Sequence, residues 1–319
     1  MIRSTPRAVD LSQDNARLRP ASTLFGAPVA DVEDLRPGVV AAIGLYCDHF
    51  CEGHPGGRFA ARQLRYTSTS AAEHTPQSVV DLGDFNVFPL EPKKTLDVLS
   101  TQAQRIVAAG AKPFAIGGDY SVSPAIVKGI VKGIVDEAGA DRLAVIRISR
   151  RLDLLPLAVN HAHEPQRRSA TNELSALLGG GLSAVALLGG RGVVTAQEWQ
   201  CASTVAVIPA RELVLAPAQA ARTVQRALER VADRFYLSVD VDVLAPRFGS
   251  VALPNTQGGL SLAQLLRIVE QLNGVPLVGA ELTGHVPDLD VPGRAMTSLV
   301  ARLASQMLEV LVGETTPCR

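Results

Sequence analysis

Phe235-Tyr236-Leu237-Ser238-Val239-Asp240-Val241-Asp242 is the stretch of this chain that decides its fold and locates its site. The apolar, β-branched residues predict a buried strand, and two carboxylates follow where that strand ends. Because successive side chains of a strand alternate between its faces, we expect Asp240 and Asp242 on one side and Val239 and Val241 on the packing side. Carboxylates paired in this way are typical of a divalent-metal site, and a positive group must lie opposite them.

The composition indicates a globular protein and excludes several classes of partner. The chain has 319 residues, 47% of them hydrophobic, with 31 basic and 31 acidic side chains, so its charge gives no indication of nucleic-acid binding. Apolar runs such as Leu182 to Leu188 are too short to cross a bilayer, and the N-terminus lacks the apolar core of a secretory signal. We therefore expect a cytoplasmic protein with no membrane or nucleic-acid partner.

The cysteines fit a reducing compartment, because four are too few for a disulfide scaffold in a chain of this size. The segment from Cys47 to His54 contains residue types that bind zinc. Structural zinc needs a second Cys/His pair, and no comparable cluster occurs elsewhere in the sequence. We therefore interpret this segment as a polar loop.

Short apolar runs alternate with amphipathic helical stretches from Val39 onward. The predicted strands are Val39 to Tyr46, Ser78 to Leu82, Pro113 to Ile116, Leu143 to Ile148, Ala184 to Leu188, Thr204 to Pro209, Phe235 to Val239 and Val275 to Glu281. The predicted helices are Lys94 to Ala109, Pro124 to Glu137, Ala216 to Arg230, Leu262 to Leu272 and Ala295 to Val312. This alternation predicts an α/β fold, a three-layer, doubly wound parallel sheet with helices on both faces. Ligands of such sheets bind at the carboxyl ends of the strands, where Asp240 and Asp242 lie.

The chain divides into an arm and one domain. Residues 1–37 are rich in proline, arginine and serine with weak periodicity, and we expect an N-terminal arm with little structure of its own. Residues 38–319 show no linker and predict a single α/β domain. The arginines Arg58, Arg62 and Arg65 predict a solvated basic helix face, or an interface if the protein is an oligomer.

Further polar motifs follow other predicted strands. They are Gly117 to Val122, Ser149 to Leu154, Asn160 to His163 and Glu281 to Pro287. With the aspartate pair, their order and spacing resemble the ureohydrolase family of arginases, agmatinases and formiminoglutamases, most of all the agmatinases, over nearly the whole chain from about Thr23. The resemblance implies an arginase-like fold, assembly into homo-oligomers that are trimers or hexamers, and hydrolysis of guanidines to urea by a hydroxide held between two manganese ions.

The resemblance also implies six metal ligands, and this chain departs from three of them. The family's Gly-Gly-Asp-His motif ends here in Tyr120, and its Asp-Ala-His-x-Asp motif reads Ser149-Arg150-Arg151-Leu152-Asp153. Asp153, Asp240 and Asp242 match family ligands and are the remnants of the set. The family's glutamate that supports guanidinium binding aligns with a glycine, Gly284.

Charge accounting predicts what replaces the metals. Three buried aspartates without a counter-ion are costly, because a closed site solvates charge poorly. Arg151 stands at a lost histidine position and can place its guanidinium between Asp153 and the aspartate pair, with Arg150 as a second cation and Tyr120 as a hydrogen-bond donor. We therefore predict no metal cofactor, a single magnesium or manganese ion on the three aspartates being the alternative.

Three functions follow from these residues. The first is a non-catalytic homologue, a pseudoenzyme that binds a small molecule or regulates a partner such as an active paralogue. The second is a metal-independent enzyme acting on an amidine, guanidine or carboxylate-bearing substrate, in which Arg150 and Arg151 bind an anion and Tyr120, His161 or His163 transfers protons. The third is an active hydrolase of C–N bonds with a rearranged metal site.

Overall fold

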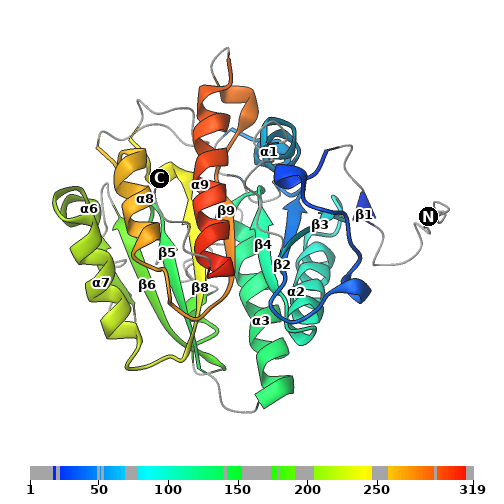
Figure 1. Cartoon of the computed structure of the whole chain (residues 1–319), viewed down its shortest axis with the longest axis horizontal. Helices are drawn as coiled ribbons and strands as arrows, with labels where there is room; N and C mark the ends of the chain where they lie inside the picture. Colours follow the sequence, from blue (N-terminus) through cyan, green and yellow to red (C-terminus); the bar gives the residue numbers. More distant parts are fainter. Residues whose placement is uncertain are drawn as a thin grey trace, which may run out of the picture.

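A computed structural model describes residues 17–18, 22–48, 51, 54–68, 78–138, 142–152, 174–178, 180–190, 205–245, 258–290 and 293–313. Within these residues one sheet runs through the molecule, with strand order β1-β3-β2-β4-β9-β8-β5-β6-β7 (Figure 1). Its strands are β1 (Arg17–Leu18), β2 (Val40–Leu45), β3 (Val79–Phe85), β4 (Lys112–Ile116), β5 (Leu143–Ile148), β6 (Leu182–Gly190), β7 (Ala206–Pro209), β8 (Arg234–Asp240) and β9 (Leu277–Thr283). Strands β2 to β9 are all parallel, and the short β1 pairs antiparallel with β3 at the edge.

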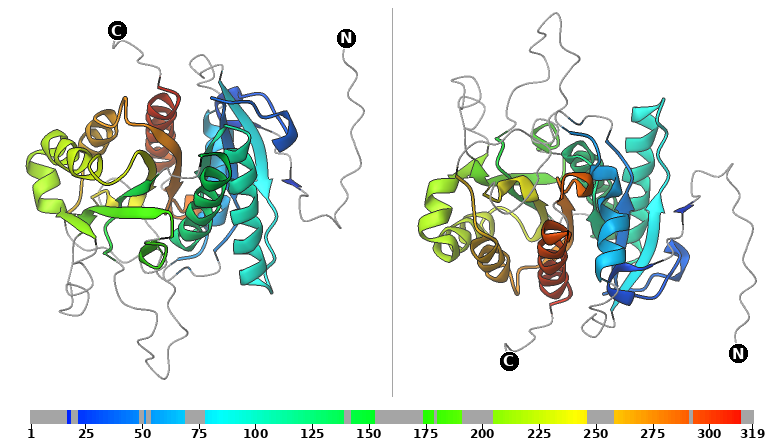
Figure 2. Two further views of the ribbon diagram at one scale, coloured as in Figure 1. Left: turned by 90° about the horizontal axis from the view of Figure 1, so that it is seen from below. Right: turned by 90° about the horizontal axis from the view of Figure 1, so that it is seen from above.

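Helices cover both faces of this sheet, which confirms the predicted fold class (Figures 1 and 2). The described helices are α1 (Ala60–Ser68), α2 (Pro92–Ala108), α3 (Ser123–Ala138), α6 (Ala210–Leu215), α7 (Pro217–Leu228), α8 (Leu262–Glu270) and α9 (Ala295–Val312). Helices α2 and α3 lie side by side on one face and build one hydrophobic core with it. The second core lies on the opposite face, between the sheet and α1, α7, α8 and α9.

Helix ends carry the local signals expected from sequence. Pro92 occupies the first turn of α2, where a missing N–H costs nothing. At the start of α8, the hydroxyl of Ser261 accepts from the Gln264 N–H at 3.2 Å, and the Gln264 side chain accepts from the Ser261 N–H at 2.8 Å. Helix α9 stops at Gly313, whose φ of 84° closes the last turn.

The described part of the predicted arm packs onto the domain. The side chain of Leu24 is fully buried in the core, and its N–H donates to Asp81 Oδ2 at 2.8 Å. Arg65 binds the same carboxylate through two of its nitrogens, at 2.8 and 2.9 Å, and also pairs with Asp84. Arg65 is only 1% exposed, so the prediction of a solvated face is wrong for this residue, because two carboxylates from β3 neutralise it inside the fold.

Helix α9 is, in the described part of the chain, the one helix long and apolar enough to cross a membrane by length and composition. More than half of that window, 56%, is buried inside the fold. It packs against α1, α8 and β9, so its apolar surface is already covered by the protein. These are the properties of a core helix.

Candidate functional site

The carboxyl ends of four neighbouring strands bring the candidate residues together. Strands β4, β9, β8 and β5 are adjacent in the centre of the sheet. The Gly117–Tyr120 segment follows β4, Gly284 follows β9, the aspartate pair ends β8, and Ser149–Arg151 follows β5. Because the strands are parallel, these segments leave the sheet at one edge, where open α/β sheets bind ligands.

The two aspartates are held by a turn instead of by strand alternation. Strand β8 ends at Asp240, and Asp242 lies in the 3₁₀ turn Val241–Val243. The carboxylate of Asp240 caps this turn by accepting the N–H of Asp242 at 2.9 Å. Both aspartates are buried, at 3% and 4% exposed. The expectation that they share one face of a strand is therefore replaced by a turn that Asp240 itself stabilises.

Arg150 is a cation that lies against Asp242, one member of the aspartate pair. Its backbone N–H donates to Asp242 Oδ1 at 3.0 Å, and its Nε lies 3.4 Å from Asp242 Oδ2. Both side chains are buried, at 9% and 6% exposed. The prediction gave the main role to Arg151, between Asp153 and the aspartate pair; Asp153 lies outside the described residues, and the contact that the structure describes is the one between Arg150 and Asp242. Strand β5 is in register with β8 up to Ile148 and Val239, so two residues later the chain delivers Arg150 beside the aspartate turn.

Arg151 and Tyr120 form the second part of the site. The guanidinium carbon of Arg151 lies 5.3 Å from the centroid of the Tyr120 ring, a cation–π contact. Tyr120 is 7% exposed and begins a 3₁₀ turn that Asp119 caps by accepting the N–H of Ser121 at 2.9 Å. Both residues stand where the resemblance implies histidine ligands. Here they bind each other.

Gly284 lies directly against the aspartate pair. A Cβ atom placed on it would come within 2.0 Å of Asp240 Oδ1, and its φ of 81° lies in the left-handed region. A residue with a side chain can therefore occupy this position only if the Asp240 carboxylate moves. Glycine is what lets the β9 loop and the aspartate turn approach so closely.

A layer of buried polar residues that was not predicted crosses the sheet at Ser238, two residues before Asp240 on β8. Arg147, Ser238 and Glu281 are in register on β5, β8 and β9, and all three are fully buried. Arg147 Nη1 donates to Ser238 Oγ at 3.0 Å, and the Tyr236 hydroxyl donates to Glu281 Oε2 at 3.1 Å. Burial raises the pKa of Glu281, and burial followed by the charge of Glu281 raises that of Tyr236. Charged residues inside two apolar strand runs were the sequence signal for this layer.

Three predicted site residues, Asp153, His161 and His163, lie outside the described residues. Within the described part, no three side chains of histidine, cysteine, aspartate or glutamate gather in a way that could hold a metal ion. The groups that the structure brings together are thus the aspartate pair, two arginines, one tyrosine and a glycine. They can neutralise one another and present a guanidinium to a ligand.

Comparison with known proteins agrees with this architecture. The family model described as "Arginase family" matches residues 39–309. The agmatinase of Bacillus subtilis (strain 168) is 26% identical over 282 residues, covering 85% of this chain and 90% of its own length. The mitochondrial guanidino acid hydrolase of Rattus norvegicus is 25% identical over 289 residues, covering 86% and 79%. Among solved structures, proclavaminate amidino hydrolase from Streptomyces clavuligerus superposes with a TM-score of 0.75 at 22% identity, covering 95% of this chain and all of its own.

Proposed function

This chain belongs to the arginase family, and we propose that it is a member in which an arginine has taken the place of the two manganese ions. In the family those ions supply a bound hydroxide as nucleophile. Without them the protein does not hydrolyse guanidines to urea by that route. Its role is then that of a non-catalytic homologue that binds a small molecule or regulates a partner.

The contact between Arg150 and Asp242 carries this proposal. Both carboxylate oxygens of Asp242 face Arg150, one at 3.0 Å from its backbone nitrogen and the other at 3.4 Å from its Nε. A metal ion would need the same lone pairs and would be repelled by the guanidinium beside them. The guanidinium of Arg150 already neutralises the buried carboxylate of Asp242, and a carboxylate can stay charged inside a protein only when such a partner is present.

The other family ligand positions support the same conclusion. Tyr120 and Arg151 stand where the resemblance implies histidines. Arg151, which stacks on the Tyr120 ring, brings a second positive charge into the site. Neither a guanidinium nor a serine, here Ser149, is a usual ligand of manganese. The donor set that the structure describes therefore does not fit a pair of divalent ions.

Gly284 removes a further element of the family's chemistry. The glutamate that the resemblance implies at this position would supply a carboxylate toward a guanidinium substrate. A side chain here would collide with Asp240, since even a Cβ atom would lie 2.0 Å from Asp240 Oδ1. The site is thus packed around a glycine and has no room for that glutamate.

An active C–N hydrolase with a rearranged metal site is the second candidate, because relatives such as the mitochondrial guanidino acid hydrolase of Rattus norvegicus carry hydrolase names. Urea release separates the two. The protein is incubated with manganese and agmatine, arginine or 4-guanidinobutyrate, and a purified agmatinase serves as the positive control. We expect no urea above background with any of them. Sustained release that depends on manganese would instead establish the hydrolase.

A further inference from the structure

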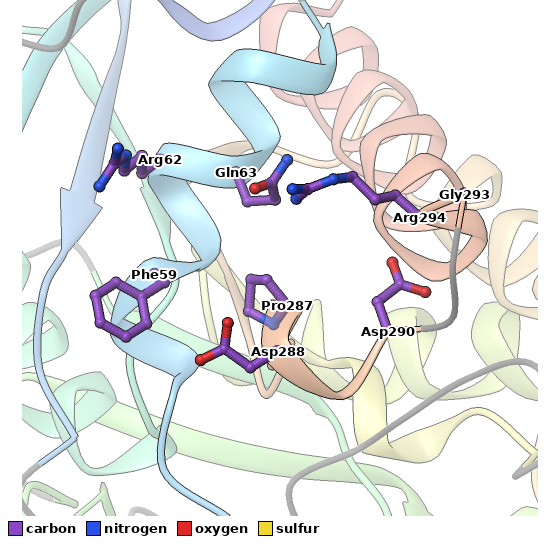
Figure 3. A pocket seen from close by; sticks show the side chains of 8 residues that line it. All are labelled: Phe59, Arg62, Gln63, Pro287, Asp288, Asp290, Gly293 and Arg294. Carbon is purple, nitrogen blue, oxygen red and sulfur yellow. The ribbon is translucent and has the colours of Figure 1, made fainter.

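A cavity of about 680 Å³ lies beside the candidate site, between α1 and the segment that leads into α9 (Figure 3). Phe59 and Gln63 line it from one side, and Pro287, Asp288 and Arg294 line it from the other. This volume is in the range of small-molecule sites in proteins. Neither the aspartate pair nor the arginines of the candidate site line it.

Complementary polar groups point into this cavity. In Figure 3 the guanidinium of Arg294 and the amide of Gln63 approach each other at one end of the cavity, and the Asp288 carboxylate lies at the other end. Within the described residues, no ion pair engages Arg294 or Asp288. The nearby Asp290 is occupied, because it accepts the N–H groups of Met296 and Thr297 at 3.0 and 2.7 Å.

The backbone holds Arg294 in an unfavourable conformation. Its φ and ψ of 56° and 41° lie in the left-handed region, which costs a non-glycine residue free energy. Asparagine or glycine would fit this position better. The capping of α9 by Asp290 fixes the conformation, and the result is a guanidinium directed at the cavity.

Phe59 provides a fixed apolar wall. Its ring meets Tyr46 edge-on, with centroids 5.5 Å apart, and the guanidinium carbon of Arg58 lies 5.0 Å from the centroid of the Phe59 ring. Asp48 holds Arg58 at two points, because its carboxylate accepts the backbone N–H of Arg58 at 2.8 Å and its Oδ2 lies 3.6 Å from Arg58 Nε. In Figure 3 Pro287 lies between Asp288 and the end formed by Gln63 and Arg294, and the Phe59 ring flanks the cavity on the side away from Arg294.

We propose that this cavity binds an amino acid in its zwitterionic form. The Arg294 guanidinium pairs with the carboxylate, which it can hold through two parallel hydrogen bonds, and Gln63 supports it. Asp288 accepts the ammonium group, and the side chain of the amino acid packs on Phe59. This site adds a ligand to the molecule and does not depend on whether the aspartate pair holds metal.

The cavity and the candidate site share the glycine-rich segment at Gly56 and Gly57. Gly57 O accepts the N–H of Gly118 at 3.0 Å, on the side of the candidate site. On the other side, a Cβ atom on Gly56 would lie 2.8 Å from a methyl group of Val286, next to Asp288. Only residues without side chains allow the segment to pack this closely between the two sites.

Calorimetric titration with the common L-amino acids tests the proposal. We expect at least one to bind, and its amide and its N-acetyl derivative to bind at least tenfold more weakly. Arg294→Gly and Arg294→Asn suit the left-handed backbone, so both should fold and weaken binding at least tenfold. Asp288→Asn should weaken binding of the amino acid while leaving that of its N-acetyl derivative unchanged.

Arg302→Met is the matched control, because Arg302 is exposed on α9 and does not line the cavity. It should bind the amino acid as the unmodified protein does. The proposal is overturned if no amino acid binds at millimolar concentration, or if both Arg294 variants bind with unchanged affinity. The second result would place any binding elsewhere, for example at Arg151.

Discussion

The buried contact between Arg150 and Asp242 should behave as one energetic unit. At an effective dielectric constant of about 20, opposite charges 3.4 Å apart attract by about 5 kcal/mol before desolvation is subtracted. Removing one partner leaves the other charge buried, so Arg150→Met and Asp242→Asn should each reduce the free energy of unfolding by about 3 to 5 kcal/mol. The double variant should lose much less than the sum of the two.

Chemical denaturation of the four proteins, followed by far-UV circular dichroism at one protein concentration, gives the coupling free energy. We expect about 2 kcal/mol or more between the two residues. Lys93 and Asp97 on α2 provide the control pair, since their side chains are 83% and 54% exposed. Their coupling should be about 0.5 kcal/mol or less, because water screens an exposed pair. A coupling of Arg150 with Asp242 no larger than that of the control would refute the replacement of metal by arginine.

Three other perturbations test separate parts of the structure. Gly284→Ala should destabilise the protein by at least about 2 kcal/mol more than Gly274→Ala. The backbone strain is matched, since φ is 81° and 82° at the two positions, but only the Cβ added at Gly284 meets a carboxylate. Equal melting temperatures of the two variants would contradict the close packing of Gly284 on Asp240. Burial lowers the pKa of His285 to about 4, below its unfolded value near 6.5, so the folded state binds fewer protons than the unfolded state. About 3 kcal/mol of stability is therefore lost as pH falls from 6.5 to 4. The variant His285→Gln should flatten that part of a curve of stability against pH. Arg294→Gly should raise the free energy of unfolding by about 0.5 to 1 kcal/mol, because relief of the left-handed strain exceeds the entropy cost of glycine. Arg302→Gly, inside α9, should lower it by about 1 kcal/mol. Changes of the same sign in the two variants would disprove the strain at Arg294.

The parallel sheet could be predicted because its strands are short apolar runs with turn residues between them. Helix α9 was predicted with its bounds, since its apolar pattern is regular and a glycine follows it. On helix α1 a solvated basic face was predicted, and the burial of Arg65 was missed for a physical reason. Arg65 occupies a core position there, and its charge is neutralised by Asp81 and Asp84, which lie 16 and 19 residues further along the chain. Periodicity within a short window cannot reveal a partner at that distance.

The position of the site could be predicted more securely than its internal contacts. Motifs at the ends of parallel strands must meet at one edge of the sheet, and the motifs that the structure describes do so. Arg150 and Arg151 are neighbours in an irregular segment, where no periodicity says which of them faces Asp242. The layer of Arg147 and Glu281 depends on strand order and register, neither of which follows from local sequence.

Metal content measured together with activity tests the central claim most directly. The protein is produced in medium supplemented with manganese, purified without chelators, and analysed by inductively coupled plasma mass spectrometry with an agmatinase prepared in parallel. We predict far less than one manganese ion per chain, and no urea release from the same preparation. About two manganese ions per chain, as the family's chemistry requires, would contradict the replacement of metal by Arg150.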